Sequence, residues 1–125
     1  MKTILVADDE ANLRKLVRAT LEDPRYRIVE AQDGTAALAL VRKEQPDLLV
    51  LDWMMPGMTG IEVAKVLVSE AADLAKRIIM LTAKGQEKDR AEASAFGIYH
   101  YLVKPFSPRE LLEKVEAVLR VHGAA

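Results

Sequence analysis

Cysteine is absent from the 125-residue sequence, so the chain can form neither a disulfide nor a thiolate metal site. This composition fits a reducing cytoplasm. No apolar run approaches the roughly 18 residues that span a membrane, and Met1 and Lys2 lead directly into a strand-like segment instead of a signal peptide. We therefore expect a soluble, cytoplasmic protein that makes no membrane contact.

A strong charge of either sign is also missing. Eighteen basic and 19 acidic residues give a net charge of -1, which offers no overall attraction for nucleic acid or for an anionic membrane. We expect no direct nucleic-acid contact, so any DNA binding would be done elsewhere. Half of the residues are hydrophobic, and the length suits one domain with a core better than two, so residues 1–125 are expected to form a single domain.

What the sequence does contain is a regular alternation of two patterns. Short apolar runs typical of strands occupy residues 3–7, 27–31, 48–51, 77–81 and 99–103. Longer segments between them have the apolar spacing of amphipathic helices, as in Leu13, Leu16, Val17 and Leu21, in Ala37, Leu40 and Val41, and in Leu111, Val115, Val118 and Leu119. Capping boxes predict helix starts at Thr59, with Glu62, and at Ser107, with Glu110. The alanine-rich residues 86–96 predict the least firmly packed helix.

Strict alternation of strands and helices predicts a doubly wound α/β domain with a parallel five-stranded sheet covered on both faces. Residues 4–7, 48–51 and 78–81 are continuously apolar, as in central strands. Residues 27–31 and 99–103 include polar side chains, as in edge strands. The flavodoxin-like strand order 2-1-3-4-5 of a (βα)5 fold agrees with this division.

Acidic residues stand at the ends of two of these strands. The first strand is followed by Asp8, Asp9 and Glu10, and the third ends in Asp52. In the expected order, the first and third strands flank the point where the strand order reverses, and ligands bind beyond the carboxyl ends of the strands at such a point. We therefore expect these carboxylates to share one crevice.

Carboxylates about 4 Å apart repel by roughly 4 kcal/mol at an effective dielectric constant near 20, so a positive partner is expected among them. Oxygen ligands with no cysteine or histidine nearby favour a hard divalent cation, and Mg²⁺ also takes a substrate phosphate. Each acid has an ordinary alternative. Asp8, Asp9 and above all Glu10 fit helix-start acids stabilised by the helix dipole, and Asp52 fits a simple cap. Their combination at the reversal point favours the metal site.

A hydroxyl and an ammonium group complete the predicted crevice. The fourth strand ends with Thr82, and Lys104, followed by Pro105, comes after the fifth. A carboxylate nucleophile, a cation and donors for the remaining charge are the parts that phosphoryl transfer uses. Asp52 would form an aspartyl phosphate, and Thr82 and Lys104 would bind the added group. Taken singly, Thr82 fits a helix cap and Lys104 a solvated loop charge.

Four motifs occur in order at the strand ends: ILVADDE, LLVLDWMMPGMTGIE, IIMLTA and YLVKPF. Together they resemble the receiver domain of bacterial two-component response regulators, a family of chemotaxis-regulator-like receivers, over residues 2–121. The resemblance implies that Asp52 is the phosphoacceptor. It also implies that Asp9, Asp52 and the backbone carbonyl of Met54 bind Mg²⁺, while Asp8 acts indirectly, through water or by positioning.

The same resemblance assigns a switch. Thr82 matches the switch hydroxyl of receivers, Lys104 the phosphate-binding lysine, and Tyr101 the aromatic residue thought to turn inward when the threonine moves toward the phosphoryl group. The family usually holds the bond between Lys104 and Pro105 in the cis form. An ordinary alternative for Tyr101 is a half-buried aromatic of an edge strand.

Partners follow from the resemblance as well. A sensor histidine kinase or a phosphotransfer protein would supply the phosphoryl group, and the face made by residues 86–96, 99–103 and 107–121 would signal to an output domain or a target protein. The same face is a possible homodimer contact. The chain would be a signalling phosphoprotein and not an enzyme, with its own phosphorylation and dephosphorylation as its only chemistry.

Two other functions compete with this one. Phosphatases of the haloacid-dehalogenase class also use a strand-end aspartate with Mg²⁺, but they place a second acid two residues later, where this chain has Met54. A receiver-shaped interaction module that works without phosphorylation would lack a core residue, and this chain has all five: Asp8, Asp9, Asp52, Thr82 and Lys104.

Three neighbouring positions concern the lifetime and detection of the phosphoryl group. Met54 and Lys84 stand two residues beyond Asp52 and Thr82, at positions that the resemblance ties to water access. Neither side chain offers the acid or amide that would orient an attacking water, so slow self-dephosphorylation is expected. Trp53 adjoins the phosphoacceptor and is expected to report metal or phosphate binding by its fluorescence.

Overall fold

The computed structural model describes residues 1–83 and 87–122, except for the side chains of residues 87–89 and 122. Five parallel strands form one sheet in the order β2-β1-β3-β4-β5. The strands are β1 (Lys2–Ala7), β2 (Tyr26–Ala31), β3 (Leu48–Asp52), β4 (Ile78–Ala83) and β5 (His100–Lys104). The helices are α1 (Ala11–Thr20), α2 (Gly34–Glu44), α3 (Gly60–Glu70), α4 (Ala72–Ala75), α5 (Glu87–Ala95) and α6 (Pro108–His122).

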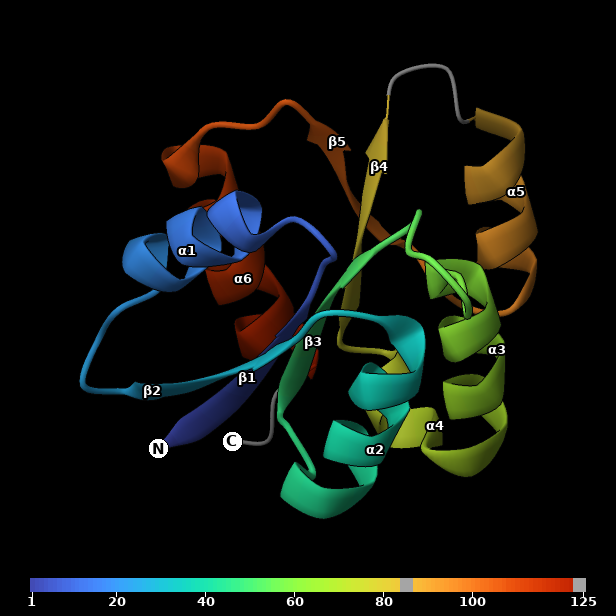
Figure 1. Ribbon diagram of the computed structural model, residues 1–125, viewed down its shortest axis with the longest axis horizontal. Coiled ribbons are helices and arrows are strands. Elements are labelled where there is room, and N and C mark those ends of the chain that lie inside the picture. The colour runs from blue at the N-terminus through green and yellow to red at the C-terminus, as the bar shows by residue number, and fades with distance from the viewer. Residues whose placement is uncertain (84–86, 123–125) are drawn as a thin grey trace.

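Helices cover both faces of the twisted sheet (Figure 1). The helices α1 and α6 lie on one face, and α2, α3, α4 and α5 lie on the other. The predicted doubly wound fold with strand order 2-1-3-4-5 is therefore confirmed. Within the part of the chain that the structure describes, no helix is both long and apolar enough to cross a membrane.

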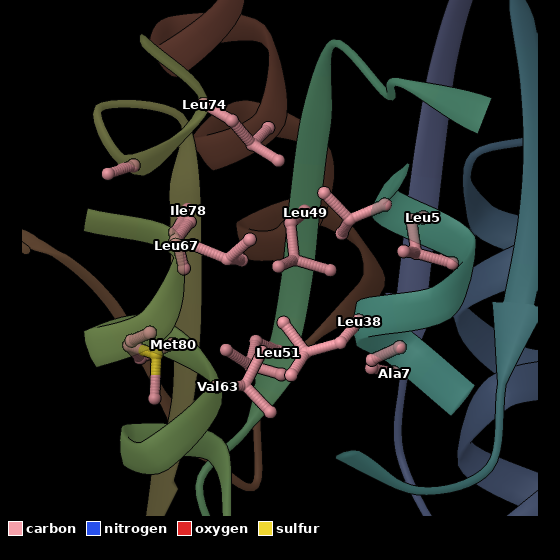
Figure 2. Close-up of a cluster of buried hydrophobic side chains, with 14 of the residues drawn as sticks. Leu5, Ala7, Leu38, Leu49, Leu51, Val63, Leu67, Leu74, Ile78 and Met80 are labelled. Carbon is pink, nitrogen blue, oxygen red and sulfur yellow. The ribbon is translucent and has the colours of Figure 1, made fainter. Parts of the chain in front are cut away.

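Two hydrophobic cores result from the alternation of side chains along the central strands. Leu49 and Leu51 of β3 point to the core beneath α2 and α3, which Figure 2 shows with Leu38, Val63 and Leu67 packed around them. Leu48 and Val50 of the same strand point to the core beneath α1 and α6. Every residue of β3 is buried, as expected for a strand covered on both faces.

The strand ends differ from the prediction in a way that matters for the site. The strand β4 runs one residue beyond Thr82, to Ala83, whereas Thr82 was expected to end it, and β5 includes Lys104 as its last residue, whereas Lys104 was expected just after it. The reason is the ladder between the two strands, in which Thr82 pairs with Val103 and Ala83 with Lys104. Both side chains are therefore held by the sheet and not by loops.

Two details of the helices were also not predicted. The four-residue helix α4 is too short for the apolar spacing by which the other helices are recognised. In α1, Leu16 was expected on the buried stripe, but it is 42% exposed, and only Val17 within the helix is fully buried.

Capping confirms the predicted starts of two helices. Thr59 and Glu62 form the reciprocal capping box of α3, and Ser107 and Glu110 exchange the same pair of hydrogen bonds at the start of α6. Among the described side chains of α5, only Ala93 is fully buried, which agrees with the prediction that this helix is weakly packed. The predicted helix began at residue 86, which lies outside the described residues.

At Gly60, the first residue of α3, the chain closely approaches the backbone at the end of β3. A Cβ atom at this position would lie within 3 Å of the backbone carbonyl oxygen of Asp52, and backbone cannot move aside as a flexible side chain can. We expect Gly60→Ala to lower the free energy of unfolding by about 3 kcal/mol in a urea titration. The matched control is Gly57→Ala, which is expected to cost only about 1 kcal/mol. Gly57 has a φ of 73° but no atom within 4 Å of a Cβ. Equal losses in the two variants would contradict the close-approach argument.

Candidate functional site

Three carboxylates meet at the carboxyl end of the sheet. Asp8 and Asp9 follow β1, and Asp52 ends the neighbouring strand β3. One oxygen of each lies within 4.8 Å of the others. Asp8 is fully buried and Asp52 is 4% exposed, whereas Asp9 is exposed. The predicted convergence of these acids at the reversal of strand order is therefore present in the structure.

A cavity of about 290 Å³ adjoins the acids and opens toward solvent. The residues that line it lie at or just after the carboxyl ends of β1, β3, β4 and β5. They are Asp9, Glu10, Asp52, Trp53, Met54, Leu81, Ala83 and Lys104. Met54 is 62% exposed, so an apolar side chain stands at the cavity beside Asp52. Trp53 is buried next to the same carboxylate and is well placed as an optical probe.

Lys104 reaches the acids from the edge strand β5. Its Nζ atom donates to Oδ1 of Asp52 at 3.0 Å and to Oδ2 of Asp8 at 3.3 Å. The peptide bond between Lys104 and Pro105 is cis, as the family resemblance implied. The ammonium group therefore lies among the carboxylates and not in the solvent, which excludes the ordinary reading of Lys104 as a solvated loop charge.

Burial dominates the electrostatics of the two inner acids. It raises the pKa of Asp52 to about 6, and repulsion from Asp8 and Asp9 adds to the rise, while the hydrogen bond and charge of Lys104 oppose it. Burial likewise raises the pKa of Asp8, against the amide of Glu10 and the ammonium of Lys104. Among the described residues, Lys104 is the one cation shown to pair with these acids, so the three carboxylates outnumber the ammonium group.

The pKa of Lys104 responds to the same neighbours in the opposite direction. Burial lowers it, but the hydrogen bonds and the attraction of Asp52 and Asp8 outweigh burial, and the net change is upward. Lys104 therefore stays charged at neutral pH. It donates hydrogen bonds to the acids but does not give up its proton there.

The donor set fits a hard divalent cation. Mg²⁺ usually binds through one or two carboxylates and keeps several waters, and this group of acids, one of them exposed, can supply those carboxylates. The group formed by Asp8, Asp9 and Asp52 could hold such an ion. The backbone carbonyl oxygen of Met54 was predicted to be a further ligand of the ion, and this stays a prediction.

Thr82 places a buried hydroxyl group near the end of β4. Its side chain is 1% exposed, and Oγ1 finds no hydrogen-bond partner among the residues that the structure describes. A buried hydroxyl without a partner costs about 1–3 kcal/mol, so it is expected to be satisfied in some state of the protein. The hydroxyl does not cap a helix, because Thr82 lies within β4.

Tyr101 is tied to the end of α5 and not to Thr82. Its hydroxyl lies 2.7 Å from the carbonyl oxygen of Arg90, 2.6 Å from that of Ile98 and 3.0 Å from Oγ of Ser94. The ring is half-buried and packs on the core beneath α3. Its predicted role as a switch remains a prediction, and Ser94 is a contact that the sequence did not reveal.

Arg14 was also missed. Its Nη1 atom donates to the backbone carbonyl oxygen of Asp8 at 2.7 Å, and its Nε atom donates to Glu30 at 3.2 Å. In the sequence, an arginine within a charged amphipathic helix is indistinguishable from a solvated surface charge, so no pattern could have singled it out.

Comparisons with known proteins agree with this geometry. The sequence model described as response regulator receiver domain matches residues 4–116. The phosphate regulon transcriptional regulatory protein PhoB of Pseudomonas aeruginosa is 44% identical over 122 residues, which cover 98% of this chain and 53% of that protein. The transcriptional regulatory protein ResD of Bacillus subtilis is 48% identical over 117 residues, which cover 94% of this chain and 48% of that protein. The chain spans about half the length of these relatives.

Two solved structures match this chain over nearly their whole length. The chemotaxis response regulator CheY4 of Vibrio cholerae has a TM-score of 0.86 and 36% identity, with 95% of this chain and 99% of that chain covered. The receiver domain of NtrX from Brucella abortus has a TM-score of 0.85 and 28% identity, with 94% and 98% covered. Since the family match extends over most of the sequence and the fold agrees with these structures, the chain belongs to the response regulator receiver domains, the signalling domains of two-component systems.

Proposed function

We propose that this chain accepts a phosphoryl group on Asp52 from a sensor histidine kinase or a phosphotransfer protein, in a Mg²⁺-dependent reaction. The observation that supports this most is the surroundings of Asp52: a buried carboxylate, hydrogen-bonded to a lysine, beside two further acids and an accessible cavity. In the transfer, an oxygen of Asp52 would form the new bond to phosphorus, and the bond between phosphorus and the donor would break.

Each neighbour of Asp52 has a part in this proposal. Asp9 and Asp52, with the carbonyl oxygen of Met54, would hold Mg²⁺, and Asp8 would act through water or by positioning. When bound, the ion supplies positive charge for the phosphoryl oxygens. Lys104 already donates to Asp52, so its ammonium group is at hand to neutralise a phosphoryl oxygen. The unpaired hydroxyl of Thr82 would gain its acceptor from the same group.

The output would follow from the charge that phosphorylation adds. A phosphoryl group brings about -1.5 to -2 charges and three acceptor oxygens, which favour an arrangement of β4 and β5 in which Thr82 and Lys104 both contact it. A change from 1:99 to 99:1 between two arrangements needs about 5.5 kcal/mol of differential stabilisation, which a few charge-assisted hydrogen bonds approach. We infer that the face of α5, β5 and α6 carries the change, with Tyr101 as its aromatic member.

The partners of this face are part of the proposal. An output domain or a separate target protein would read it, and a homodimer through it is one possible form of the signal. PhoB and ResD are named as transcriptional regulators, and half of their length lies outside the match to this chain. We therefore propose that any DNA contact is made elsewhere, and that residues 1–125 act as a single receiver unit.

A phosphatase of the haloacid-dehalogenase class is the competing enzyme. It would need an acid two residues beyond Asp52 to protonate the leaving group. Met54 stands there, and its exposed apolar side chain has no proton to give. We therefore propose a signalling domain whose only chemistry is its own phosphorylation and dephosphorylation.

Incubation with a small phosphodonor and Mg²⁺ tests the phosphoacceptor directly. We expect the intact mass to increase by one phosphoryl group and expect no increase for Asp52→Asn, whose side chain cannot form the acyl phosphate. Steady release of phosphate from small phosphoesters, measured in parallel, would instead support the enzyme. An unchanged mass in both proteins would favour the interaction module that works without phosphorylation.

Met54 provides a test of the phosphoryl lifetime. We expect Met54→Asn to lose phosphate faster than the parent, because an amide beside Asp52 can orient water where the thioether cannot. The increase in the rate of phosphate loss should stay below the roughly hundredfold effect of a side chain that also accepts a proton from the attacking water. Intact mass followed over time measures it, Met54→Leu is the apolar control, and equal lifetimes of all three proteins would contradict the prediction. Lys84, the other residue tied to water access, lies outside the described residues.

The raised pKa of Asp52 predicts a pH dependence of stability in the absence of divalent cations. Between pH 3.8 and about 6 the folded state keeps a proton that the unfolded state has released, so the free energy of unfolding falls as the pH rises through this window. The loss attributable to Asp52 is roughly 3 kcal/mol. Urea unfolding in a chelating buffer is expected to show a flatter profile for Asp52→Asn across this window. Parallel profiles would contradict the raised pKa.

A further inference from the structure

The turn that carries Asp8 and Asp9 lacks the usual support at the start of a helix. Glu10 is the residue before α1, but its side chain makes no capping hydrogen bond to the helix, unlike Thr59 before α3. Helix starts normally take such a bond from a serine, threonine, aspartate or asparagine. Asp8, the first of the two acids, is instead held by contacts with other parts of the chain.

Asp8 is held at each of its polar atoms. Its amide donates to the carbonyl oxygen of Ala31 at 3.1 Å, its Oδ1 accepts from the amide of Glu10 at 2.8 Å, and its Oδ2 accepts from Lys104. Its carbonyl oxygen accepts from Arg14 at 2.7 Å. This last bond joins α1 to the peptide group between Asp8 and Asp9. The Cα atom of Asp9 is bonded to this peptide group, so the position of the peptide determines where the Asp9 side chain begins.

Arg14 can hold this peptide because it is itself held. Its side chain is 16% exposed, and Nε donates to Glu30 of β2 while Nη1 turns toward Asp8. A guanidinium group serves two acceptors in fixed directions, whereas the single ammonium of a lysine cannot reproduce that fork. Glu30 also binds Arg18, but Arg18 does not reach Asp8.

We propose that Arg14, aimed by Glu30, is a positioning residue for the metal site: it fixes the peptide between Asp8 and Asp9 so that the carboxylate of Asp9 faces Asp52. This inference rests on the proposed function for the identity of the ion, but the contacts of Arg14 with Asp8 and Glu30 do not depend on it. Arg14 touches neither the ion nor the phosphoryl group in this proposal.

Charge and positioning predict opposite effects of removing Arg14. Arg14 brings a positive charge to the backbone of Asp8 and so repels a second cation at the metal site. On charge alone, Arg14→Gln would therefore bind Mg²⁺ more tightly. If Arg14 positions Asp9, the same variant binds Mg²⁺ more weakly, because supporting contacts of metal ligands typically contribute about 10–100-fold to affinity. The sign of the change therefore separates the two accounts.

Titration with Mg²⁺, followed by calorimetry and by the fluorescence of Trp53, is the first test. We expect Arg14→Gln and Arg14→Lys both to bind about tenfold more weakly than the parent, the lower end of the range because Arg14 acts through the backbone. Arg18→Gln is the matched control, since it also removes an arginine from Glu30, and it is expected to leave the affinity within about twofold. Affinity equal to or above that of the parent in Arg14→Gln would overturn the proposal.

Amide hydrogen exchange of the metal-free proteins is the second test, and it does not depend on the proposed function. The amide of Glu10 bonds to Asp8, so it is expected to exchange faster in Arg14→Gln and at the parental rate in Arg18→Gln. If the parent binds no Mg²⁺, the proposed metal site fails, and the exchange result alone decides the role of Arg14. Unchanged exchange in Arg14→Gln would overturn it, and circular dichroism verifies that each variant is folded.

Discussion

The rest of this structure depends on holding like charges together at one end of a buried sheet. Asp8 and Asp52 are almost wholly removed from water, and burial raises the pKa of both. Lys104 is the only side chain shown to donate to both of them within the described ranges 1–83 and 87–122. A fold that keeps ionised carboxylates in this position needs a strong scaffold, and the two cores on either side of β3 provide it.

The same scaffold encloses Asp52 more tightly than it encloses α5. Asp52 ends a strand whose residues are all buried, and the chain after it is tied back by the amide of Gly60, which donates to the carbonyl oxygen of Trp53. In contrast, α5 buries only Ala93 among its described side chains, and the hydroxyl of Tyr101 connects its last turns to β5. Among the described residues, packing is therefore tighter at β3 than at α5, and we expect local stability to follow it.

The sequence predicted the fold because the determinants of the fold are local and repeated. Continuous apolar runs marked β1, β3 and β4 as central strands, and the two capping boxes marked the starts of α3 and α6. It also predicted that Asp8, Asp9 and Asp52 would converge, since parallel strands bring their carboxyl ends to one edge. The exact strand ends were less predictable, because the pairing of Ala83 with Lys104 depends on a neighbour far along the chain.

The contacts that the sequence could not predict are those made by side chains with many possible partners. Arg14, Ser94 and Glu30 each look like ordinary polar residues of a surface, and their partners lie on other elements. The hydroxyl of Thr82 is a different case, because the residue was predicted but its burial without a partner was not. Such features follow from packing in three dimensions, which no one-dimensional pattern encodes.

The bond between Lys104 and Asp52 connects the last residue of an edge strand to the last residue of a central one, across the intervening β4. A change in the charge of Asp52 would therefore act directly on the edge strand β5, through its hydrogen bond with Lys104. This contact joins the centre of the sheet to its edge directly, without a chain of intervening side chains.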